Sequence, residues 1–315
     1  MNEPTLTIVL PCFNEGVGLA RALDAIDIQL SALGMPAEIL AVDDGSSDAT
    51  WALLSTTRLP HAQVQALRLS RNFGKEAAIL AGLGHARGRA VIVMDADLEH
   101  PPTLIPELVS AWRAGAPIVN ACKRQRQLAA PGRTLAARAF YAVFQRITGM
   151  DLEHDSDFKL LDRSVVDALL RFPERVRFFR GLARSIGFEQ TDILFTPAAG
   201  TREQSTFTTR QLARFAIRAV VSFSARPLRW LAYVGVAVAM AASALALQTI
   251  YLKLTGRAAE GFPTVILLIL GGTSLQLLGL GIVGEYLSAI YEEAKRRPHY
   301  LIARVHRADS TEKLS

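Results

Sequence analysis

Asp95 and Asp97 flank Ala96 directly after the apolar run 90–94. A run that is apolar at every position is typical of a parallel strand buried on both faces, and ligands of open α/β sheets collect beyond the carboxyl ends of such strands. Carboxylate oxygens are suitable ligands for Mg²⁺ or Mn²⁺, and Mg²⁺ is usually held by one or two carboxylates together with substrate phosphates. The pair therefore predicts a divalent-metal site for a nucleotide-diphosphate substrate.

The spacing of two acids around one residue is a weak signal by itself. It recurs at Asp155 and Asp157, so the strand context is what favours the first pair.

Asp43 and Asp44 also follow a run typical of a strand, 38–42. The carboxyl ends of parallel strands share one edge of a sheet, so we expect this second acidic pair near Asp95. The alternative is a turn or a helix cap, and one of the two, with Asp48, fits that role.

Short apolar runs alternate with helical periodicity through the N-terminal third of the chain. Strands are expected at 6–10, where Pro11 ends the run, and at 38–42, 64–69 and 90–94, with helices at 15–33 and 75–85. Strands that alternate with helices predict an α/β fold built on a doubly wound, mostly parallel sheet.

The apolar residues of this 315-residue chain are concentrated near its C-terminus. Segments 228–252 and 264–282, the second extending towards Tyr291, are almost free of charge. Each is long enough to cross a hydrocarbon core of about 30 Å as a helix. They predict two transmembrane helices, and the alternative is a pair of buried core helices.

Basic residues flank these spans on one side. Arginines precede the first span, Lys295 follows the second, and the short connection 253–263 is nearly neutral. Because positive charge is retained in the cytoplasm, both termini and the N-terminal domain are expected there, at the inner (plasma) membrane. No secretory signal is visible in 1–7, and the two cysteines are expected to be reduced.

The net charge of +6 has a membrane explanation as well. Arg210, Arg214 and Arg218 recur every four residues, which predicts a basic amphipathic helix lying on an anionic membrane surface. The alternative is a solvated face of a helix packed on the domain. No basic platform rich in aromatic residues occurs, so no nucleic-acid partner is expected.

Four ordered motifs, IVLPCFNE from Ile8, VDDGSSDAT from Val42, SRNFGKEAAILAGL from Ser70 and DADLEHPP from Asp95, together resemble family 2 glycosyltransferases of GT-A fold. The later motifs DSDFKLLDRSVVDAL, RFFRGLARSIGF and SFSARPLRW are similar to the polyprenyl-phosphate subgroup, which includes dolichol- and undecaprenyl-phosphate enzymes. The resemblance implies inverting transfer of one sugar to polyprenyl phosphate, giving a lipid-linked monosaccharide for envelope glycosylation.

The resemblance also implies a set of site residues. Those that hold the nucleotide sugar, with a UDP-sugar favoured, are Pro11, Phe13, Glu15, Asp43, Asp44, Lys75, Asp95, Ala96 and Arg202. The Mg²⁺ or Mn²⁺ ligands are Asp95, Asp97 and Glu99, where the family usually has glutamine at the third position.

The acceptor determines how much base catalysis is needed. A lipid phosphate has a second pKa near 6 and is largely dianionic, so a general base is optional. Asp157 either acts as a base, orients a sugar hydroxyl, or caps the helix 164–170. Positive charge must bring the two anions together, and the candidates are Lys123, Arg126, Arg133 and Arg202. Many relatives have a lysine at Thr206, and here Arg202 is expected to replace it.

The expected organisation is a catalytic domain (1–207), a juxtamembrane helix (208–227), a membrane anchor (228–291) and a cytoplasmic tail (292–315). Gly284 and Ser288 form a pair of small residues that favours close helix packing, and thus a homo-oligomer. The enzymatic alternative is a polysaccharide or glycolipid synthase with a hydroxyl acceptor, for which Asp157 would be indispensable. The other alternative is an inactive membrane scaffold.

Overall fold

The computed structural model describes residues 4–123, 156–171, 179–195, 226–255, 262–295 and 297–307. The chain divides into two units, which are described separately: one holds a β-sheet and its helices, and the other holds two long helices.

The described residues of the first unit form an eight-stranded sheet. Its strands are β1 (Leu6–Cys12), β2 (Ala37–Asp43), β3 (Gln63–Leu69), β4 (Ala90–Val93), β5 (Ile118–Lys123), β6 (Lys159–Asp162), β7 (Gln190–Phe195) and β8 (Ile302–Arg307). Their spatial order is β7-β5-β6-β4-β1-β2-β3-β8. The β1–β2, β2–β3, β1–β4 and β5–β7 pairs are parallel, whereas β6 and β8 pair in the antiparallel sense.

The predicted α/β class and mostly parallel sheet are confirmed, but β1 does not end at Pro11. Pro11 lies within the strand and pairs with Val42 of β2. The carbonyl of Val9 faces β4, where it accepts from the N–H of Met94. Pro11, two residues on, faces the same side beyond the last β1–β4 pair. Its missing N–H therefore breaks no ladder bond, because proline is tolerated where no partner strand needs a donor.

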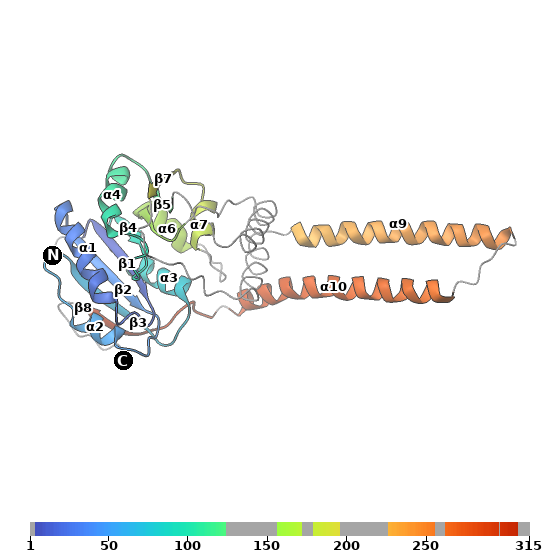
Figure 1. Ribbon diagram of the computed structural model, residues 1–315, viewed down its shortest axis with the longest axis horizontal. Coiled ribbons are helices and arrows are strands. Elements are labelled where there is room, and N and C mark those ends of the chain that lie inside the picture. Colours follow the sequence, from blue (N-terminus) through green and yellow to red (C-terminus); the bar gives the residue numbers. More distant parts are fainter. Residues whose placement is uncertain are drawn as a thin grey trace. The chain divides into compact units, whose positions relative to one another are not determined.

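Helices cover both faces of the sheet (Figure 1). One face packs against α1 (Leu19–Leu33), α2 (Thr50–Thr56) and α4 (Ile105–Arg113), which is preceded by a short 3₁₀ turn, η1 (Pro102–Leu104). The other packs against α3 (Lys75–His85), α6 (Arg163–Arg171) and α7 (Phe179–Ser185). This two-sided cover explains why β1, β2 and β4 are mostly apolar on both faces.

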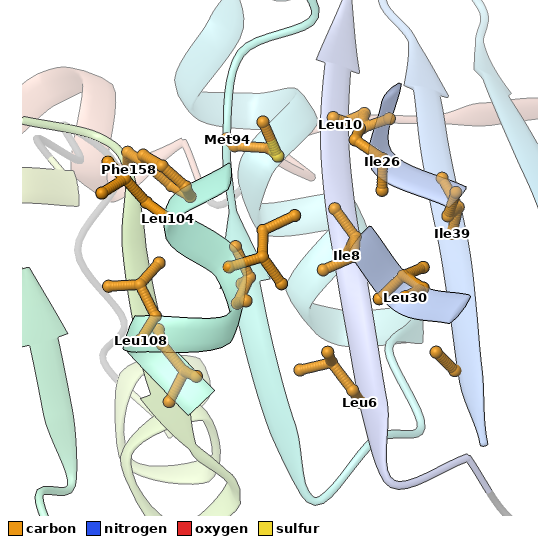
Figure 2. Packing of buried hydrophobic residues seen from close by; sticks show 14 of the residues in the cluster. Leu6, Ile8, Leu10, Ile26, Leu30, Ile39, Met94, Leu104, Leu108 and Phe158 are labelled. Carbon is orange, nitrogen blue, oxygen red and sulfur yellow. The ribbon is translucent and has the colours of Figure 1, made fainter. Parts of the chain in front are cut away.

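The first helix begins at Leu19, later than the residue 15 expected from periodicity, so Glu15 lies in the preceding loop. Its buried leucines and isoleucine recur at helical spacing, and Figure 2 shows Ile26 and Leu30 facing Ile8 and Ile39 of the sheet. Gly34 ends the helix in the left-handed conformation, with φ of 59°, which glycine adopts without steric cost.

Helix α3 approaches the sheet unusually closely. A Cβ atom at Gly82 would lie 2.3 Å from Cγ1 of Val9 on β1, so only glycine fits there. This contact fixes α3 against the centre of the sheet, and its first residue is Lys75.

The C-terminal segment contributes a strand to the sheet. Residues of β8 return to the sheet and pair antiparallel with β3, an element that the sequence analysis did not predict. Ile302 and Val305, with Tyr300 before them, pack partly buried against the core beside α3. The strand is short and only half apolar, which is why its periodicity gave no signal.

The second unit holds α9 (Arg226–Leu254) and α10 (Phe262–Ala294), which lie side by side (Figure 1). Gly279 of α10 gives room for Leu231 of α9, since a Cβ there would lie 2.9 Å from Cδ1 of Leu231. Windows 233–252 and 271–291 have mean hydropathies of 1.7 and 1.2. By length and composition, both helices are able to cross a membrane. The predicted helix at 208–227 lies outside the described residues.

Candidate active site

The predicted acidic pair lies at the carboxyl end of β4. Ala96 is buried, the Asp95 side chain is one-quarter exposed, and Asp97 is open to solvent. The turn that follows is tight: Asp97 Oδ1 accepts the Glu99 N–H at 2.9 Å, and Leu98 has a φ of 60°. A leucine rarely adopts this left-handed conformation, so the loop after β4 holds local backbone strain beside the two carboxylates.

Lys75 joins the two acidic motifs that the sequence analysis treated separately. Its Nζ lies 2.7 Å from Oδ1 and 2.8 Å from Oδ2 of Asp95, and 2.6 Å from Oδ2 of Asp157. Asp157 is buried, with its side chain only 8% exposed. One ammonium group thus bridges the end of β4 to the residue two positions before β6.

The electrostatics of the site are dominated by negative charge. Burial raises the pKa of Glu15, and the nearby carboxylates of Asp97, Asp95 and Asp48 raise it further. The pKa of Asp95 is also raised, chiefly by burial, although Lys75 opposes the shift. Carboxyl groups that share a site disfavour each other's ionisation, so the cluster is suited to a cation.

The neighbouring carboxylates also determine the charge of Lys75. Burial alone would lower the pKa of Lys75, but Asp157 and Asp95 outweigh it and raise the pKa. The side chain therefore stays an ammonium ion between two carboxylates.

Asp44 fixes the loop that delivers Lys75. Its Oδ1 accepts the Phe73 N–H at 2.7 Å, and its Oδ2 accepts the Gly74 N–H at 2.8 Å. Burial raises the pKa of Asp44 even though these two bonds favour the charged form. Both carboxylate oxygens accept from the backbone before α3, so Asp44 holds this loop, and its predicted contact with a nucleotide stays a prediction.

Asp43 is completely buried. Its Oδ1 accepts the Ser46 N–H at 2.8 Å, and its Oδ2 lies 3.4 Å from Nε of Arg68. Its predicted contact with a nucleotide stays a prediction.

The loops after β1 and β2 are tied together by side chains that the sequence analysis did not single out. Asn14 donates its N–H to Ser46 Oγ at 2.9 Å, and its Oδ1 accepts the Ser47 N–H at 3.0 Å. Asn14 has a φ of 57°, a conformation that asparagine tolerates better than most residues. Asparagine is common in turns, so Asn14, shortly after the apolar run 6–10, is the signal from which this turn could have been predicted. Phe13 beside it is 46% exposed and is available to a ligand.

The donor set fits a hard divalent cation. Asp95 and Asp97 supply carboxylate oxygens, and Asp95 already holds a cation, the Lys75 ammonium, at close range. Among the described residues no group of three or more His, Cys, Asp or Glu side chains is arranged to hold a metal. Asp95, Asp97 and Glu99 therefore do not form a complete site by themselves, and substrate phosphates or water would provide the remaining ligands, as is usual for Mg²⁺.

Of the four basic candidates, the structure describes Lys123. Lys123 is the last residue of β5. Arg126, Arg133 and Arg202 lie outside the described residues.

A family profile described as "Glycosyl transferase family 2" matches residues 7–173. The chain is 39% identical to an uncharacterized glycosyltransferase of Synechocystis over 95% of this chain and 94% of that one. It is 33% identical to a prophage bactoprenol glucosyl transferase homolog of Escherichia coli, covering 95% of this chain and 99% of the relative. Among solved structures, it is similar to a glucosyl-3-phosphoglycerate synthase of Mycobacterium tuberculosis, with 20% identity, a TM-score of 0.44, and coverage of 70% and 79%.

Proposed function

The chain belongs to glycosyl transferase family 2 and is a glycosyltransferase, and from this we propose that it transfers one sugar from a nucleotide-diphosphate sugar to polyprenyl phosphate. The observation that carries the proposal is the full-length match to the bactoprenol glucosyl transferase homolog, which includes the two long apolar helices. Bactoprenol is a polyprenyl carrier, and a match along the whole chain favours a shared type of acceptor.

On the donor side, Asp95 and Asp97 would hold Mg²⁺ or Mn²⁺ against the diphosphate. When bound, the metal supplies Lewis-acid stabilisation of the charge on the departing nucleotide. Glu99, two residues after Asp97, would support it. Phe13 and Glu15 would contact the nucleotide from the loop after β1. We favour a UDP-sugar as the donor.

On the acceptor side, a phosphate needs little deprotonation, because its second pKa is near 6. Asp157 is paired with Lys75 at 2.6 Å, a geometry suited to orienting a sugar hydroxyl or the acceptor. Lys123, Arg126 and Arg202 would attract the acceptor phosphate. Attack from the side opposite the leaving group would invert the anomeric centre.

The membrane placement is part of the same proposal. The chain leaves the sheet-containing unit before α9 and returns to it as β8 after α10. If α9 and α10 each cross the bilayer once, the start of α9 and the end of α10 lie on the same side, which we assign to the cytoplasm from the flanking charge. A hydrophobic acceptor would then be met at the inner membrane surface, and association of copies through α10 would give a homo-oligomer.

The test is transfer by purified full-length protein in detergent, with undecaprenyl phosphate, Mn²⁺ or Mg²⁺, and a panel of UDP- and GDP-sugars. We expect a lipid-linked monosaccharide from one donor, lost in Asp97→Asn and in EDTA, and kept in Asp24→Asn, an exposed carboxylate on α1. If sugar is transferred only to a hydroxyl acceptor, the proposed phosphate acceptor is wrong and the protein is a glycolipid or polysaccharide synthase.

A further inference from the structure

Lys75 contacts Asp95 in a way that bears on metal binding. Both carboxylate oxygens of Asp95 lie within 2.8 Å of the Lys75 Nζ. These are the two oxygens that a divalent cation at Asp95 would use. A metal and an ammonium at the same carboxylate would lie a few ångströms apart and repel each other.

The Lys75 ammonium also contacts Asp157, which is not among the expected metal ligands. Asp157 Oδ2 lies 2.6 Å from Nζ and its side chain is far less exposed than that of Lys75, at 8% against 40%. A lysine that loses Asp95 can therefore keep Asp157 with a small change of side-chain rotamer.

The backbone that carries Lys75 is fixed on both sides. Asp44 holds the N–H groups of Phe73 and Gly74, and Gly82 packs α3 against Val9. Any adjustment is therefore confined to the lysine side chain, whose four-carbon stem is flexible.

We propose that Lys75 is a positioning residue that competes with the divalent metal for Asp95 and is retained by Asp157 when the metal binds. The inference rests on the proposed function, in which Asp95 is a metal ligand. Metal binding would then change the partners of Lys75 from Asp95 and Asp157 together to Asp157 alone.

The experiment measures Mn²⁺ binding to the full-length protein in detergent without nucleotide or lipid, by the loss of the free Mn²⁺ EPR signal. Lys75→Met is expected to bind Mn²⁺ roughly tenfold to a hundredfold more tightly, the range that corresponds to one charge-assisted hydrogen bond that no longer has to be broken. Lys75→Arg, which keeps the charge, is expected to stay near wild type. Arg21→Met, which removes an exposed charge on α1, is the control for net charge.

A second variant tests the role of Asp157. In Asp157→Asn the ammonium loses its alternative partner, so Mn²⁺ binding is expected to weaken, and this effect should shrink in the Lys75→Met background because the two residues are coupled. Thermal unfolding of each variant verifies that it is folded.

An unchanged or weaker Mn²⁺ affinity in Lys75→Met would overturn the inference, as would an equal effect of Asp157→Asn in both backgrounds. A loss of UDP affinity alone would instead assign Lys75 to the nucleotide. The transfer assay distinguishes failure of this inference from failure of the proposed function. Sugar transfer by the wild type together with an unchanged Mn²⁺ affinity in Lys75→Met refutes only the inference. Tighter Mn²⁺ binding in Lys75→Met without any transfer by the wild type refutes only the proposed acceptor chemistry.

Discussion

Removing the Asp44 carboxylate should destabilise the fold even without any ligand. In Asp44→Ala the N–H groups of Phe73 and Gly74 lose their acceptors, which lie at 2.7 and 2.8 Å in a buried setting. A hydrogen bond to a charged group contributes about 1.5–3 kcal/mol, so the two together give a loss of roughly 3–6 kcal/mol in the free energy of unfolding. Asp44→Asn keeps one acceptor oxygen and should lose about half as much.

The assay is thermal unfolding of the full-length protein in detergent, without metal or nucleotide. For a domain of about 150–250 residues, 1 kcal/mol shifts Tm by about 2–4 °C, so Asp44→Ala should unfold roughly 6–24 °C below wild type. Asp24→Asn, an exposed carboxylate on α1, should leave Tm unchanged. If Asp44→Ala unfolds at the wild-type temperature and only nucleotide affinity falls, then Asp44 is a ligand-binding residue and the loop-holding role is wrong.

Three further outcomes follow from the structure. Ending the chain after Tyr300 deletes β8, and loss of the partly buried Ile302 and Val305 should cost about 2 kcal/mol and expose the β3 edge, measurable as a lower Tm and as aggregation. Burial alone would raise the pKa of Asp162, but hydrogen bonds from Ser164 and Trp112 outweigh it and lower the pKa. The carboxylate therefore stabilises the fold above its unfolded pKa, so Asp162→Asn should cost about 1 kcal/mol at pH 7, and its difference in Tm from wild type should shrink as the pH falls below about 4. Burial, with Glu15, Asp43 and Asp95, raises the pKa of Cys12, so this thiol should resist maleimide at pH 8 in the folded protein and react once the protein is unfolded, as mass spectrometry would show.

Much of the local structure follows from the sequence alone. The four apolar runs became β1 to β4, and helix 75–85 has the bounds that its periodicity predicted. The two long apolar segments became α9 and α10. These features are encoded locally, because the period of apolar residues reflects which side of a helix or strand is buried. The position of Asp95 at a strand's carboxyl end was predictable for the same reason.

The tertiary structure determines which of the site's side chains are in contact. Lys75 is 20 residues from Asp95 and 82 from Asp157, yet one ammonium contacts both. That contact exists because β6 pairs with β4, and α3 packs over β1 and β2, with β1 next to β4 in the sheet. Strand order and the pairing of β8 with β3 depend on contacts between distant segments. No local period specifies such contacts, so the sequence predicted the acidic motifs, whereas the fold determined that a lysine joins them.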